Sequence, residues 1–189
     1  MAFFPAPSAA LGARTSDAAR VRSCMDTQYE AVWRFLRRLG VRAADVDDAT
    51  QKVFLVLAGR VASIAHGAER SFLFASAIRV ASDARRKRAR SRESLAEDGE
   101  TFDVEDPAAS AEDGIDDRRM RRWLDEVLDS LSEEHRAVLV LVDIEEQTMA
   151  EASDVLGIPK GTVASRLRRS RELFEEYANA LKARLEKEV

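Results

Sequence analysis

The sequence predicts an all-α protein made of two small helical domains joined by an acidic linker. The chain has 189 residues, only eight Gly and four Pro, and abundant Ala, Leu, Glu and Arg, which favour helices over hairpins. Apolar side chains recur at helical spacing in both halves. Between the halves the charge changes sign abruptly, which marks a domain boundary.

The first expected helix spans residues 17–39. Residues 1–17 contain Pro and several small side chains, and we expect them to form a disordered tail. From Tyr29 to Leu39 apolar residues recur at steps of three and four, and Gly40 supplies a C-terminal stop.

Two further helices are expected before the linker. Asp45 is a candidate N-cap for a helix over 45–59. The third helix, over 69–90, ends in RRKRARSR (85–92), with six cations in eight positions. Such a run is either a solvated face or a surface for nucleic acid or an acidic partner, and the sequence leaves both open.

The linker is expected over residues 93–117. This segment holds eleven acids and no base, and without them the net charge of −4 becomes +7. It has too few large apolar residues to offset its ordering entropy. As a flexible coil it would span roughly 25–30 Å, with a ceiling of roughly 80–90 Å. The acids either stay solvated or screen the basic surfaces, and the second alternative is a hypothesis.

The C-terminal half predicts a helix-turn-helix. An amphipathic helix ends near Leu131, and Ser132 is the expected N-cap of the next helix, over 133–144. Thr148 and Glu151 form a capping-box pattern that begins a short helix, and 157–159 (Gly-Ile-Pro) is a tight turn before the last helix.

The last helix has the side chains that major-groove binding requires. Val163 and Leu167 are expected to face inward, which leaves Thr162, Ser165 and the arginines exposed. Residues 160–171 hold five cations and no acid. The pattern favours DNA binding; the alternative is a helical hairpin with a solvated Arg face.

Several classes of function are excluded or disfavoured. The single Cys24 cannot form an internal disulfide, and the two histidines, His66 and His135, are too few for a Cys/His zinc site, so no cofactor or metal is expected. No apolar run is long enough for a membrane span or a signal peptide, so a cytoplasmic protein is expected. A nuclease with Mg²⁺ at Asp45, Asp47 and Asp48 is disfavoured because helix capping explains acids there, and no nucleophile–base pair points to an enzyme.

The sequence resembles the extracytoplasmic-function (ECF) sigma factors of the sigma-70 family of bacterial RNA polymerase. LDSLSEEHRAVLVLVDIEEQTMAEASDVLGIPKGTVASRLRRSRELF (128–174) resembles sigma region 4, and DATQKVF (48–54) resembles the D-x-x-Q-x-V-F segment of region 2. The resemblance implies region 2 over 18–92, with core polymerase and minus-ten binding, and region 4 over 118–183, with minus-thirty-five binding.

The resemblance also implies partners and site residues. The partners are core RNA polymerase (β′ and β subunits), promoter DNA and, as often in this family, an anti-sigma factor. The implied core-polymerase residues are Asp48, Gln51 and Phe54. The implied minus-ten residues are His66, Phe72, Phe74, Arg79, Asp83, Arg86 and Lys87. The implied minus-thirty-five residues are Lys160, Gly161, Thr162, Ala164, Ser165, Arg166, Arg168 and Arg169.

Some of these roles have alternatives. His66 could be an ordinary surface residue, and Phe72 and Phe74 could be core residues. Phe72, Arg79 and Ala164 depart from the residues common in the family, so the promoter sequence cannot be transferred from relatives. An operator-binding regulator that works without polymerase, and a polymerase-binding regulator without promoter recognition, are the competing functions.

Overall fold

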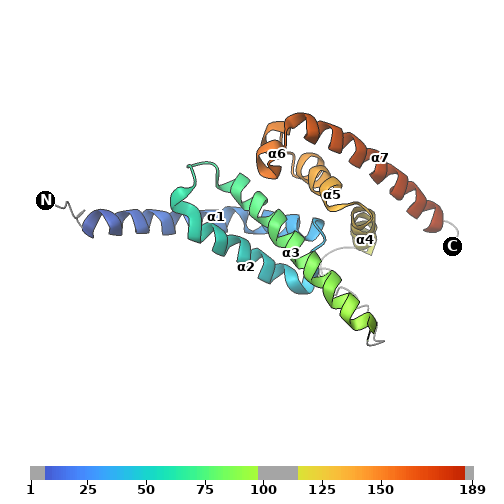
Figure 1. Cartoon of the computed structure of the whole chain (residues 1–189), viewed down its shortest axis with the longest axis horizontal. Helices are drawn as coiled ribbons and strands as arrows, with labels where there is room; N and C mark the ends of the chain where they lie inside the picture. Colours follow the sequence, from blue (N-terminus) through green and yellow to red (C-terminus); the bar gives the residue numbers. More distant parts are fainter. Residues whose placement is uncertain (1–6, 98–114, 186–189) are drawn as a thin grey trace.

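The computed structural model describes residues 7–97 and 115–185, and all regular elements in these ranges are helices (Figure 1). The all-α prediction is confirmed. Residues 98–114, most of the expected linker, and residues 1–6 of the expected tail lie outside the described residues.

The N-terminal half is a bundle of three helices. They are α1 (Pro7–Arg38), α2 (Ala43–Arg60) and α3 (Glu69–Glu97), with a 3-10 turn over Val61–Ser63. Each of the three helices packs against the other two. Their shared core is made of aliphatic and aromatic side chains spaced along one face of each helix.

Three boundaries differ from the expected ones. Helix α1 begins at Pro7, so the expected tail is already helical there, because Ala favours helix and Pro fits the first helical position. Asp45 is not an N-cap: α2 is preceded by Arg42, whose Nε donates to Asp45 Oδ2 at 2.8 Å in the first turn. Helix α3 continues to Glu97, beyond the expected end.

The C-terminal half contains four helices and a π-helical segment. They are α4 (Ile115–Asp129), α5 (Glu133–Leu139), the π-helical Val140–Ile144, α6 (Met149–Leu156) and α7 (Lys160–Leu185). The expected linker therefore begins inside α3, which ends at Glu97, and ends inside α4, which begins at Ile115. The long α7 crosses over α5, α6 and α4.

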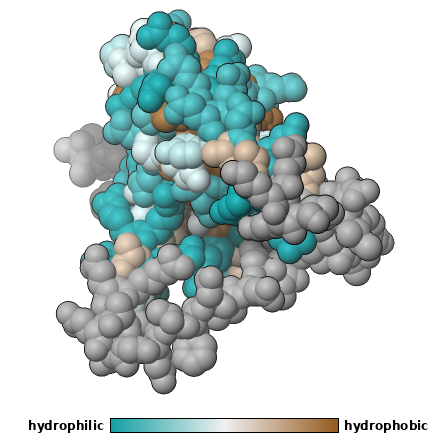
Figure 2. Space-filling model, turned by 90° about the vertical axis from the view of Figure 1, so that its right-hand side faces the viewer, coloured by the Kyte–Doolittle hydropathy of each residue, from teal (hydrophilic) through white to brown (hydrophobic). Residues whose placement is uncertain are grey.

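The predicted caps of this half are confirmed. The Ser132 hydroxyl accepts from the His135 backbone N–H, and Thr148 and Glu151 form the reciprocal capping box. Gly157 adopts φ 66° at the end of α6, a left-handed conformation that favours glycine. On the side of the molecule that Figure 2 shows, the described residues are mainly hydrophilic, with small hydrophobic patches.

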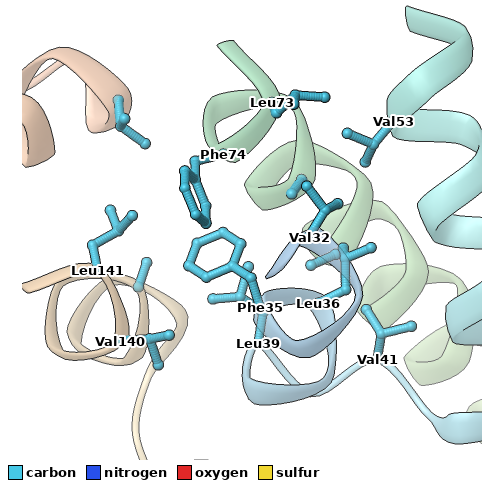
Figure 3. Packing of buried hydrophobic residues seen from close by; sticks show 14 of the residues in the cluster. Val32, Phe35, Leu36, Leu39, Val41, Val53, Leu73, Phe74, Val140 and Leu141 are labelled. Atoms are coloured by element: carbon cyan, nitrogen blue, oxygen red, sulfur yellow. The ribbon is translucent and has the colours of Figure 1, made fainter. Parts of the chain in front are cut away.

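The two halves pack against each other in the described conformation. In Figure 3, Val140 and Leu141 of the C-terminal half lie opposite Phe35 and Phe74 of the N-terminal bundle, and all four belong to one hydrophobic cluster. At the edge of the contact Arg38 Nη1 donates to Glu145 Oε1 at 2.7 Å. One core therefore runs through both halves.

A buried arginine lies in this contact between the halves. Arg136 of α5 is 1% exposed, pairs with Asp129 at 2.7 Å, and lies directly against Gly40 at the end of α1. Burial lowers the pKa of Arg136, and the nearby Asp129 carboxylate opposes that shift. Because Gly40 has φ +87° and a Cβ there would collide with the guanidinium, this approach requires glycine.

Candidate polymerase and nucleic-acid interface

The helix-turn-helix is formed by α6, the turn at Gly157 and α7. Thr148 Oγ1 accepts from the Glu151 backbone N–H at 3.2 Å, and Glu151 Oε2 accepts from the Thr148 backbone N–H at 2.8 Å. The hydrogen bonds that the Glu151 carboxylate accepts from the Thr148 backbone N–H and from the Thr148 hydroxyl lower the pKa of Glu151. Ser153 Oγ donates to the Ile158 carbonyl at 2.6 Å, which ties the turn to α6.

The first three turns of α7, residues 160–171, form what we call the recognition helix. Val163 and Leu167 are buried, as predicted, so this helix has a fixed orientation. The exposed predicted residues are Lys160, Gly161, Ala164, Ser165, Arg168 and Arg169, while Thr162 and Arg166 are half-buried. The structure thus brings the predicted minus-thirty-five residues onto one continuous helix.

Arg166, Arg168, Arg169 and Arg171 of the recognition helix all lie within 4.0 Å of an acid, and Arg166 and Arg169 form the closest pairs among the predicted DNA contacts. Arg166 Nη2 lies 2.8 Å from Glu134 Oε2 on α5, and Arg169 Nη1 lies 3.0 Å from Glu172 Oε2 one turn along α7. The Glu172 hydrogen bond raises the pKa of Arg169. Both ion pairs are solvent-accessible, so replacing the carboxylate partner of either arginine by a DNA phosphate costs little free energy.

Sequence reasoning missed two residues that hold the recognition helix in place. The Ser170 hydroxyl is buried and shares its one proton between the Arg166 carbonyl of its own helix, at 2.7 Å, and the His135 carbonyl of α5, at 3.0 Å, so it links α7 to α5. Arg171 donates two hydrogen bonds, of 2.9 and 2.6 Å, to the two Asp143 oxygens. The partners His135 and Asp143 lie 28 or more residues away, so no local pattern identifies them.

The connection between α2 and α3 carries His66. The resemblance implies that residues 64–69, around His66, capture a base flipped from the minus-ten strand, and we call the whole connection, residues 61–68, the base-capture loop. Residues 65–68 are exposed, including His66, and Gly67 has φ +88°. Arg20 of α1 contacts this loop and Glu69 at once, an interaction that sequence reasoning did not find.

Helix α3, which follows that loop, presents charged side chains along its exposed face. Arg79, Asp83, Arg86 and Lys87 are all exposed, as a DNA-facing surface requires. Phe72 is half-buried. Phe74, however, is 1% exposed, in edge contact with Phe35 at 4.6 Å between ring centroids. The prediction that Phe74 contacts minus-ten DNA is therefore wrong for this conformation, because its ring is part of the core.

The surface of α2 holds the predicted polymerase residues. Asp48 and Gln51 are exposed. Phe54 is buried, and its ring is stacked on Tyr29 at 5.9 Å between centroids. In this conformation Phe54 therefore packs inside the bundle and is not exposed to a partner protein. Sequence reasoning missed Leu55, which is 70% exposed, a large apolar side chain beside Gln51.

Two of the three acids at the start of α2 have a partner within the bundle. Asp45 pairs with Arg42, and Asp47 accepts from the Trp33 indole N–H at 2.8 Å. Within the described ranges 7–97 and 115–185, His, Cys, Asp and Glu nowhere form a group able to hold a metal ion. In the same ranges none of the helices has the length and apolar character to span a membrane.

Comparison with known proteins decides the family. Residues 121–174 match the family model for sigma-70, region 4. The ECF RNA polymerase sigma factor SigL of Mycobacterium tuberculosis is 32% identical over 158 residues, covering 82% of this chain and 87% of the relative. The chain belongs to the ECF RNA polymerase sigma factors.

Further relatives agree with this family. The ECF RNA polymerase sigma factor SigE of Mycolicibacterium smegmatis is 34% identical over 149 residues, 78% of this chain, although the chain spans only 57% of that relative. CnrH, solved with the cytosolic domain of CnrY, has TM-score 0.65 and 20% identity, covering 90% of this chain and 95% of that one. The sigma factor RpoE of Bartonella quintana, solved with the anti-sigma factor NepR, has TM-score 0.66 and 19% identity, covering 84% and 96%. At these identities the two structures show that the chain shares their fold.

Proposed function

We propose that this ECF sigma factor binds core RNA polymerase and directs it to promoters with a minus-ten and a minus-thirty-five element. It acts as a non-catalytic initiation subunit in the cytoplasm. Residues 18–92 serve as region 2 and residues 118–183 as region 4. The observation that carries the proposal is the recognition helix, which has buried Val163 and Leu167 on one face and short polar and Arg side chains on the other.

The polymerase surface is assigned to α2. Asp48 and Gln51 are exposed one helical turn apart, and the exposed Leu55 adds an apolar contact one turn further on. Exposed large apolar side chains next to polar ones are typical of protein interfaces. We assign this stripe to the β′ clamp helices, with the buried Phe54 fixing the position of α2.

The minus-ten surface is assigned to the base-capture loop and the exposed face of α3. Exposed Arg79, Arg86 and Lys87 would hold the backbone of the opened strand, with Asp83 beside them. His66 stands in the exposed part of the loop, where an unstacked base could be captured. Phe72 is the aromatic side chain that remains partly accessible on this face.

The minus-thirty-five surface is assigned to the recognition helix. Thr162, Ser165 and the small Gly161 and Ala164 allow close approach to base edges, because short side chains keep the helix near the groove floor. The cationic side chains are then placed to contact guanine edges or flanking phosphates. They are Lys160, Arg166, Arg168 and Arg169.

Binding both elements requires the two halves to separate. Two elements 25 base pairs apart lie about 85 Å apart along B-DNA at about 3.4 Å per pair. In the described conformation Arg85 of α3 and Arg166 of the recognition helix line one cavity of about 160 Å³, so the two surfaces are far closer than that. Dyes on cysteines introduced at the exposed positions 26 and 154, in a Cys24→Ser background, should therefore lose energy transfer when the free chain enters the open complex, and unchanged transfer would contradict separation.

A controlling protein partner follows from the relatives. CnrH was solved with CnrY, and RpoE with the anti-sigma factor NepR. By analogy we propose that an anti-sigma factor binds this chain and competes with core polymerase. Whether it binds can be measured by co-purification of the chain with candidate partners, in the presence and absence of core enzyme.

Run-off transcription with purified core RNA polymerase tests the function. The template is the DNA upstream of the gene for this chain, because many sigma factors of this family activate themselves. A discrete start site that depends on the chain is expected. If an active core enzyme gives no chain-dependent transcript while the chain alone binds the same DNA, the operator-binding alternative replaces the proposal.

A further inference from the structure

The base-capture loop is fastened to α1 by the side chain of Arg20. Arg20 Nη1 donates to the Val61 carbonyl at 3.0 Å, and Nη2 donates to the Ile64 carbonyl at 3.0 Å. Nε and Nη2 donate to Glu69 Oε1 at 3.0 and 2.5 Å. One guanidinium therefore holds the start of the loop, its middle and the first residue of α3.

Glu69 completes this contact from the other end of the loop. Its second oxygen, Oε2, accepts from the Gly67 backbone N–H at 2.7 Å, next to His66. The Arg20 hydrogen bond lowers the pKa of Glu69, so the carboxylate is ionised at neutral pH. Both side chains are largely enclosed, at 13% and 16% exposure, which excludes much of the water that would compete for these donors.

The other hydrogen bonds that the structure shows in this loop are local. The Ile64 N–H donates to the Val61 carbonyl at 3.2 Å, and the Ala68 N–H donates to the Ala65 carbonyl at 3.1 Å. Each joins residues three apart and closes a single turn. By contrast, the Arg20 contacts span 41 to 49 residues. Val61 is buried and Ile64 packs against the core, so apolar contacts also anchor the first half of the loop. The Arg20 contacts add long-range polar bonds that fix the Val61 and Ile64 carbonyls and Glu69 relative to the bundle.

We propose that Arg20 and Glu69 form a clamp that sets the shape of the base-capture loop and thereby determines which base the minus-ten surface selects. The clamp acts without touching DNA, so both are positioning residues. This inference rests on the proposed function of the loop. Its physical basis is that discrimination between bases needs hydrogen-bonding groups held in fixed positions, and an unfastened loop would adapt to several bases.

The geometry makes arginine specifically necessary. A planar guanidinium can donate to two carbonyls and a carboxylate at the same time, whereas a lysine ammonium is a compact charge on a flexible stem. Arg20→Lys therefore keeps the charge but loses the three-way contact. This variant separates a role of geometry from a role of charge.

The test uses the full chain with core polymerase and promoters that carry each of the four bases at each minus-ten position. For each variant, the half-saturating promoter concentration and the maximal initiation rate are measured separately. The wild type should prefer one base at the captured position by about tenfold, the size of one good base contact. Arg20→Ala and Arg20→Lys should reduce this ratio toward one, while Glu69→Gln, which keeps an acceptor oxygen, should have an intermediate effect.

Two controls make the result interpretable. Arg34→Ala removes another α1 arginine, which is exposed and pairs with Glu30 one turn away, and it should keep the wild-type base preference. Hydrogen exchange on the free chain should show faster exchange of residues 61–68 in both Arg20 variants than in Arg34→Ala. If Arg20→Ala folds too poorly to assay, Arg20→Lys decides.

The outcomes separate the two hypotheses. A wild-type preference that survives unchanged in the Arg20 variants would overturn the clamp and leave the proposed function standing. A wild-type chain that initiates with no base preference at any minus-ten position would instead contradict the minus-ten assignment itself, and the clamp with it.

Discussion

The recognition helix and the base-capture loop are two DNA-facing surfaces that the chain builds in different ways. The helix before the recognition helix is capped by a contact between near neighbours, Thr148 and Glu151. The recognition helix itself is packed against the core through the buried Val163 and Leu167. The base-capture loop is held by Arg20, which lies 41 to 49 residues earlier. Local caps and packing position the start of the first surface, with long-range bonds from Ser170 and Arg171 at its far end. The second surface is anchored by Val61 and Ile64 and owes its long-range hydrogen bonds to one distant side chain, Arg20.

The largest expected effect comes from removing the packing under the recognition helix. Leu167 is 2% exposed, so Leu167→Ala should lower the free energy of unfolding by about 2–5 kcal/mol. Chemical denaturation measures this change. Minus-thirty-five binding should weaken, while hydrogen exchange in the base-capture loop should stay as in the wild type. Faster exchange there would show that the two surfaces are not separately supported.

Breaking the clamp should have the next largest effect, and it should depend on pH. Arg20→Ala should cost about 1.5–3 kcal/mol at pH 7, because hydrogen bonds to charged groups are lost. The pKa of Glu69 is lowered from its ordinary value of 4.5, so the clamp stabilises fully above that pH and progressively less as pH falls through the folded-state pKa. Urea unfolding of the wild type and the variant from pH 7 to pH 3 should therefore give converging stabilities.

A smaller effect is expected at the capping box. Thr148→Ala should lower stability by about 1 kcal/mol, because the first turn of α6 loses its side-chain acceptor. Thermal unfolding measures it, and Thr148→Ser is the matched control because Ser can cap in the same way. Equal melting temperatures for the Ala variant and the wild type would show that packing alone holds α6.

The smallest effect is expected from a single exposed arginine. Arg169→Ala should leave stability nearly unchanged but reduce by about one the slope of log affinity against log salt for minus-thirty-five DNA. Arg184→Ala, on the same helix but paired with Glu126 far from the turn, should keep the wild-type slope. An unchanged slope in Arg169→Ala would remove that residue from the phosphate contacts.

The same contrast explains how far the sequence could predict the structure. Ser132, Thr148, Glu151 and Gly157 act through neighbours within a few residues, so the helix-turn-helix could be predicted in detail. The prediction of Asp45 as the N-cap was wrong because α2 begins two residues earlier, at Ala43, so Asp45 lies inside the first turn, where its carboxylate pairs with Arg42.

Long-range contacts could not be predicted in the same way. Phe74 has helical spacing whether it faces DNA or the core, and only the packing of Phe35 and Leu141 around it decides between them. The Arg20 clamp and the Ser170 bond to His135 join distant parts of the chain, for which a single sequence carries no local signal.

One experiment tests most directly whether the two surfaces read separate promoter elements. Initiation by core polymerase with the wild type, Arg20→Lys and Arg169→Ala is measured on promoters altered in either element. Arg20→Lys should lose base selection at minus-ten and keep its dependence on minus-thirty-five, and Arg169→Ala should keep minus-ten selection and weaken at minus-thirty-five. Equal losses at both elements in both variants would contradict the account.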